Sequence, residues 1–235
     1  MIIPCYLALT AAEFANTDTL PENCAYMACH FSCYGDGLSN LPESLPSGAI
    51  LILNDRTPIY RHDPKRILSQ LEAFVAENDL SGILLDFQRP GVPLTGEVAR
   101  TLTQSLHCPV AVTPAYGKGL SCPLFLPPPP LHIPLKDHIA PYGDRELWLE
   151  LAPETMRYIV GKENCVTEEM DHPPLPEPYL TEKASFCRYH IKIKEDRAEF
   201  ILQRTESELR DMLLAECSIS RAVGLYQQLK KMPTG

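Results

Sequence analysis

Short runs of apolar residues recur along the first two-thirds of the chain, and each run ends in a polar residue followed by turn-forming residues. Most runs are continuous rather than alternating in hydrophobicity, which is typical of strands that are buried on both faces of a parallel sheet. We therefore predict strands at Tyr6–Leu9, Ala25–Phe31, Ala49–Leu53, Gly82–Phe87, Pro109–Val112, Leu124–Leu126 and Glu146–Leu151.

Helical patterns separate several of these strands. A helix is predicted from the N-cap Asp63 to Asn78, with Pro64 in the first helical position and apolar residues along one stripe. A second amphipathic helix is predicted over 97–106. The run Pro127–Pro130 cannot lie inside a helix, so a short stiff connection replaces a crossover helix there.

This alternation of buried strands and helices predicts an α/β fold, a degenerate TIM-type (β/α) barrel. In such a barrel, Gly82–Phe87 should lie in a parallel sheet between Ala49–Leu53 and Pro109–Val112. We treat 1–235 as a single domain, of which 1–153 is the main parallel-strand region.

The pattern changes after residue 153. Region 154–204 is predicted to be rich in β-hairpins, one over 156–168 and a longer one over 186–203, because apolar and polar positions alternate around short turns. Region 205–235 is predicted to form a pair of C-terminal helices. The capping box Thr205–Glu208 begins the first, and Ser218 or Ser220 begins the second. We expect these helices to bury Leu209, Leu213 and Leu225.

The net charge and the cysteine content limit the partners and the cellular compartment that we expect for the chain. The formal net charge of −9 disfavours nucleic-acid partners and anionic membranes. The chain carries nine cysteines without a CxxC pair, mostly within apolar runs, which predicts reduced buried thiols and no disulfide. The start of the chain lacks a basic segment, and no apolar run reaches membrane-spanning length, so we predict a cytoplasmic protein.

Polar residues at the ends of the predicted strands form the candidate site, because function gathers at the carboxyl ends of barrel strands. Asp55, Asp86 and Glu150 are the candidate catalytic carboxylates, a set that suits acid–base chemistry on a glycosidic bond. Each has a structural alternative: a strand-end aspartate often caps the following turn. Candidate ligand-binding residues around them are His30, Tyr34, Gln88, Arg89, Tyr116 and Trp148.

A zinc site at Cys24, Cys29, His30 and Cys33 is a further alternative, although its spacing is irregular and Cys29 and His30 would point to opposite sides of a strand. We therefore predict neither a metal nor a cofactor.

The segment Ser81-Gly82-Ile83-Leu84-Leu85-Asp86-Phe87-Gln88 resembles the D-G-x-D-x-D-x-E motif of family 18 glycoside hydrolases, which include the chitinases. Gly82 and Asp86 match that motif, and Gln88 stands where the family keeps its catalytic glutamic acid. The resemblance implies a (β/α) barrel with a carbohydrate cleft, and the glutamine argues against hydrolysis by the family's own route.

These observations predict a glycoside-hydrolase-like barrel that recognises a glycan or related polar ligand, with hydrolysis left open. One alternative is a non-catalytic ligand-binding or protein-interaction barrel. Another is nucleic-acid binding through 206–231, which resembles a helix-turn-helix with a basic tail at Lys230-Lys231. The acidic balance of the chain disfavours that last alternative. The sequence does not fix an oligomeric state.

Overall fold

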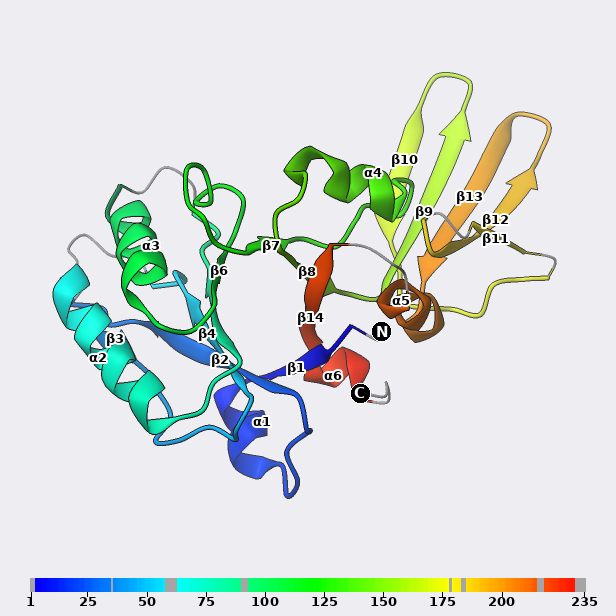
Figure 1. Ribbon diagram of the computed structural model, residues 1–235. Helices are drawn as coiled ribbons and strands as arrows, with labels where there is room; N and C mark the ends of the chain where they lie inside the picture. Colours follow the sequence, from blue (N-terminus) through cyan, green and yellow to red (C-terminus); the bar gives the residue numbers. More distant parts are fainter. Residues whose placement is uncertain are drawn as a thin grey trace. The chain divides into compact units, whose positions relative to one another are not determined.

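Figure 1 shows the computed structural model of the chain, which describes residues 3–34, 36–57, 63–89, 93–177, 179–182, 185–214 and 218–230. These residues divide into two compact units. One is built from 3–127, 145–150 and 218–230, and the other from 128–144 and 151–214. The prediction that the chain folds as a single domain stays a prediction.

The first unit, the barrel unit, is a closed parallel β-barrel. Its strands are β1 (Cys5–Leu9), β2 (Cys24–Phe31), β4 (Ile50–Asn54), β5 (Gly82–Asp86), β6 (Val110–Val112), β7 (Leu124–Leu126), β8 (Leu147–Leu151) and β14 (Ile219–Leu225). The sheet closes because β1 pairs in parallel with both β2 and β14. A short strand, β3 (Leu38–Ser39), adds an antiparallel edge to β2.

The predicted sheet is confirmed at its centre: β5 pairs in parallel with β4 on one side and β6 on the other. Helices α1 (Ala11–Asn16), α2 (Pro64–Glu77), α3 (Pro93–Ser105) and α6 (Tyr226–Leu229) belong to the same unit. Helix α2 begins as predicted, with the Asp63 side chain accepting a hydrogen bond from the backbone N–H of Arg66.

The second unit, the sheet unit, contains a five-stranded antiparallel sheet in the order β10-β9-β13-β12-β11. Its elements are α4 (Leu135–Ile139), a 3₁₀ turn (Ala140–Tyr142), β9 (Glu154–Gly161), β10 (Cys165–Glu169), β11 (Leu180–Glu182), β12 (Cys187–Ile193), β13 (Arg197–Arg204) and α5 (Glu206–Leu213). Both predicted hairpins are confirmed, as β9–β10 and β12–β13. The buried Arg204 guanidinium donates to the backbone carbonyls of Pro129, Ser185 and Phe186.

The second of the two predicted C-terminal helices forms only in its last part, as the short helix α6 (Tyr226–Leu229), and the prediction is wrong for the residues before it. Helix α5 forms and buries Leu209 and Leu213, but Ile219–Leu225 is barrel strand β14, and Leu225 remains 39 % exposed. The apolar spacing of this segment fits a helix as well as a strand that is buried on both faces, and pairing with β1 decides in favour of the strand. The helix-turn-helix alternative falls with it, since its recognition helix would span this strand. Residues 215–217 and 231 of that alternative lie outside the described residues.

Candidate functional site

The inside of the barrel is filled by side chains that alternate along each strand. Ile50 and Ile52 of β4, Leu84 of β5 and Trp148 of β8 belong to one buried apolar cluster. Because the side-chain period of a strand is two residues, the next inward positions are Asn54, Asp86 and Glu150, at or near the carboxyl ends of their strands. The barrel therefore changes from an apolar interior to a polar mouth within one layer.

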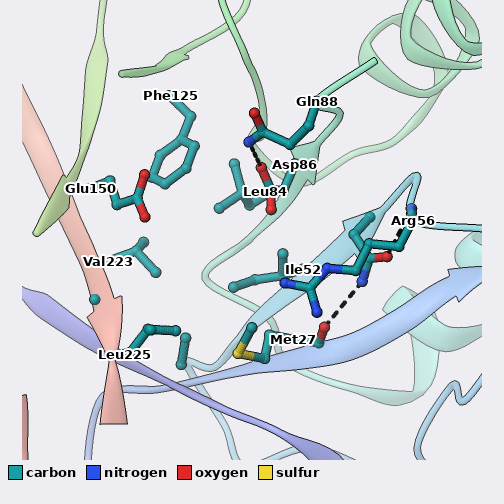
Figure 2. A pocket seen from close by; sticks show the side chains of 13 residues that line it. Met27, Ile52, Arg56, Leu84, Asp86, Gln88, Phe125, Glu150, Val223 and Leu225 are labelled. Atoms are coloured by element: carbon teal, nitrogen blue, oxygen red, sulfur yellow. Dashed lines mark hydrogen bonds between the residues drawn. The ribbon is translucent and has the colours of Figure 1, made fainter. Parts of the chain in front are cut away.

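A pocket opens at this mouth, with a cavity volume of about 170 Å³. Figure 2 shows Asp86, Gln88, Glu150 and Arg56 around it, together with apolar side chains that include Leu84. Other members of the apolar lining are Ile52, Phe125, Val223 and Leu225. The pocket combines an apolar floor with a few polar groups, which is the usual composition of a small-molecule site.

Asp86 and Gln88 form one polar unit in this pocket. The Gln88 side-chain amide Nε2 donates a hydrogen bond to Asp86 Oδ1 (Figure 2). Burial raises the pKa of Asp86, the nearby negative charge of Asp55 adds to the rise, and the Gln88 hydrogen bond and the Arg56 charge oppose it. With its amide committed in this way, Gln88 holds Asp86 in a fixed orientation.

Glu150 reaches the same pocket from β8. Burial raises the pKa of its carboxyl, and the negative charge of Asp86 raises that pKa further. Among the residues that the structure describes, the Glu150 carboxylate has no hydrogen-bonding or ion-pair partner. It is therefore available to a ligand, either as an acceptor or, when protonated, as a donor.

Comparison with known proteins gives matches in structure but not in sequence. No family model and no curated protein matches the chain. The spore cortex-lytic enzyme SleL of Bacillus cereus matches with 9% identity and a TM-score of 0.56, over 94% of this chain and 70% of that one. A family 18 (GH18) chitinase variant of Cycas revoluta, solved in complex with (GlcNAc)4, matches with 9% identity and a TM-score of 0.55, over 96% of this chain and 95% of that one.

The protein YdhD of Bacillus subtilis also matches, with 9% identity and a TM-score of 0.52, over 85% of this chain and 89% of that one. The chain shares a TIM-type (β/α) barrel fold with these structures. At this level of identity the likeness establishes the fold and leaves the activity open.

Asp55, the third predicted carboxylate, does not line the pocket. Its side chain is 5% exposed, and its two oxygens accept hydrogen bonds from the backbone N–H groups of Gln88 and Arg89, each at 3.0 Å. Asp55 thus ties the segment after β4 to the segment after β5. This arrangement agrees with the structural alternative given for Asp55, in which a strand-end aspartate accepts hydrogen bonds from backbone N–H groups of a turn.

Trp148 also lies away from the pocket lining. It is fully buried within the barrel, where its Nε1–H donates to Glu146 Oε1 at 3.2 Å. The Arg221 guanidinium lies 4.8 Å from the centre of its ring, and Arg221 also donates to Ser81. In this environment Trp148 packs the barrel interior.

The remaining predicted ligand-binding residues, His30, Tyr34, Arg89 and Tyr116, do not line the pocket. The Tyr116 hydroxyl donates to the carbonyl of Arg89, and the Arg89 guanidinium donates to the carbonyl of Arg56. His30 contacts Thr57 and Asn40 through its ring nitrogens, and Tyr34 is 81% exposed on a loop. The contacts of Tyr116 and Arg89 thus connect the loops that follow β4, β5 and β6.

The described residues include no group of three or more His, Cys, Asp or Glu side chains arranged to hold a metal ion. None of the helices in the described ranges is long and apolar enough to cross a membrane.

Sequence reasoning missed Asn54 and Arg56 as pocket residues. The signal was present in the register: Asn54 pairs with Asp86 across β4 and β5, so Asn54 and Arg56 are in phase with the inward positions and Asp55 is out of phase.

Proposed function

We propose that this chain is a glycan-binding barrel that holds a sugar residue at its carboxyl-terminal mouth and does not cleave it by the route that the family 18 motif implies. The observation that carries the proposal is the Asp86–Gln88 pair at the end of β5, hydrogen-bonded within an open pocket.

The size and lining of the pocket suit one sugar ring. Its volume of about 170 Å³ is close to that of an engineered cavity that takes up benzene, about 150 Å³. Phe125 offers an aromatic ring to the apolar face of a sugar, while Asp86 and Glu150 can accept hydrogen bonds from hydroxyl or amide groups. The complex of the structurally similar cycad chitinase with (GlcNAc)4 supports N-acetylglucosamine as the class of sugar.

Gln88 is the reason to propose binding without cleavage. A glutamine amide donates hydrogen bonds, but it has no proton that it can transfer to a leaving oxygen near neutral pH. Loss of a general acid typically lowers the rate by about 10²–10⁴-fold. Asp86 can still orient an acetamide group, so recognition survives where turnover does not.

Two assays test the proposal together. Calorimetric titration with an N-acetylglucosamine tetramer should show binding to the wild type and its loss in Asp86→Ala. A chromogenic N-acetylglucosamine oligomer should not be cleaved by the wild type. Absence of tetramer binding, or binding that Asp86→Ala leaves intact, would refute recognition at this pocket.

A second candidate function is hydrolysis with Glu150 as the acid, favoured by a carboxyl of raised pKa that lines the pocket and lacks a partner among the described residues. In that case the wild type cleaves the chromogenic oligomer and Glu150→Gln does not. Cleavage that appears only in Gln88→Glu would instead mark a family 18 site that the glutamine has silenced.

A further inference from the structure

The five-stranded sheet of the sheet unit has two chemically different faces. Directly paired residues of neighbouring strands project from the same face, so the register assigns each side chain to one face. Ile191, Phe200 and Tyr158 form one row across β12, β13 and β9. Ile193 and Val160 belong to the next row on the same face, which we call the apolar sheet face.

The opposite face is the polar one. There the Arg157 guanidinium makes ion pairs with Glu199 at 3.0 Å and Glu168 at 3.4 Å, across β9, β13 and β10. An antiparallel sheet with one solvated face normally places its polar residues on that face and covers the apolar one. Here the polar face already carries ion pairs suited to solvent, so the apolar sheet face is the one suited to burial.

The apolar sheet face is nevertheless open. Ile193 is 80% exposed, and Leu180, which joins the face through its pairing with Tyr189, is 60% exposed. Ile191 and Val160 are exposed as well. Scattered surface hydrophobics are ordinary, but neighbouring ones that share a face of a sheet mark an interaction surface.

We propose that the apolar sheet face pairs with the same face of a second copy of this chain. The exposed large hydrophobic side chains of the face are all aliphatic, and they offer a glycan or a nucleic acid no group to hydrogen-bond. The adjacent turn segments 162–164 and 194–197 contain Lys162, Glu163, Lys194, Glu195, Asp196 and Arg197, three charges of each sign. A balanced set of charges gives no attraction to an anionic membrane, but it can pair with itself across a two-fold axis.

The dimensions of the face fit a weak dimer. The apolar positions of the face lie on β9, β13, β12 and β11, because on β10 the same face carries Cys165, Thr167 and Glu169. Four strands at about 4.8 Å spacing and up to three rows of side chains along each strand cover roughly 19 Å by 20 Å, or about 380 Å² in projection. A stable interface buries about 800 Å² on each partner, so this footprint places the pair in the weaker, concentration-dependent class.

Sedimentation equilibrium of the full chain tests this proposal. The apparent mass should rise from monomer towards dimer between about 1 and 200 μM. Replacing Ile191 and Ile193 by lysine should raise the dimer dissociation constant by about a hundredfold or more, because lysines would be buried without partners. The matched control is Val166→Lys, since Val166 is 45% exposed on the polar face and its replacement should leave the dissociation constant unchanged.

Thermal unfolding of each variant verifies that the fold persists. A wild-type monomer across the whole concentration range would overturn the proposal. So would a dimer that resists the double lysine variant, or one that Val166→Lys weakens equally.

Discussion

Replacing Asp55 by alanine separates a structural from a catalytic role for this carboxylate. In the wild type, the two Asp55 oxygens accept hydrogen bonds from the backbone N–H groups of Gln88 and Arg89. The alanine variant removes the acceptor of both N–H groups at a side-chain position that is nearly buried. It also releases the segment that carries Gln88.

The size of the effect follows from these two hydrogen bonds. A buried donor that loses its partner costs about 1–3 kcal/mol, more when the partner is charged. Water can reach part of the surroundings of these two donors, so the lower half of that range applies and the sum is about 2–4 kcal/mol. That is a large share of a typical unfolding free energy of about 5–15 kcal/mol.

Urea unfolding at neutral pH, followed by circular dichroism, measures this loss. Asp63→Ala is the matched control: Asp63 is an exposed aspartate that accepts one backbone hydrogen bond at the start of α2, and its loss should cost about 1 kcal/mol. Asp55→Asn keeps one acceptor oxygen and should fall between Asp55→Ala and the wild type. A value for Asp55→Ala within about 0.5 kcal/mol of the wild type would refute the structural role.

Three further predictions concern packing, charge and burial. Gly82→Ala should destabilise the fold by about 1–3 kcal/mol in urea unfolding, because its Cβ would lie 2.7 Å from Trp148 and 2.8 Å from the carbonyl oxygen of Pro109; an unchanged midpoint would contradict this. Burial and the nearby negative charge of Asp86 raise the pKa of Glu150 in the folded chain. The fold therefore has its full stability at pH values below the ordinary pKa of a glutamate, where the carboxyl is protonated. It loses stability as the pH rises through the raised pKa, because the buried carboxyl must then ionise. Glu150→Gln should therefore match the wild type in acid and melt at a higher temperature at neutral pH, whereas an offset that does not vary with pH would argue against this. Arg204→Met should lower the free energy of unfolding by more than about 2 kcal/mol, because it leaves buried carbonyl groups without a hydrogen-bond donor. A smaller loss in urea unfolding would show that water replaces the guanidinium.

Much of the barrel could be predicted from the sequence because its strands are buried on both faces and read as continuous apolar runs. Ala49–Leu53 and Gly82–Phe87 are examples, and the structure pairs these segments in parallel. The same feature misled the prediction for Ile219–Leu225. A strand without polar alternation gives no clear period, and its pairing with β1 at the other end of the chain is a long-range contact that no local pattern reveals.

The candidate site could be predicted in part for a similar reason. Asp86 and Glu150 lie in strands whose inward phase is set by Leu84 and Trp148, and the structure places both carboxylates in the pocket. Asp55 follows a strand too, but one residue out of phase, so its side chain meets backbone N–H groups instead of the pocket. A strand-end position is therefore insufficient without the phase of the strand.

Saturation-transfer NMR of an N-acetylglucosamine tetramer mixed with the wild-type chain tests whether the barrel binds the sugar without cleaving it, because one set of ligand spectra reports both binding and cleavage. We expect saturation transfer from the protein to the sugar protons, with the tetramer remaining intact. Absence of saturation transfer, or new reducing-end anomeric signals from shorter oligomers, would contradict it.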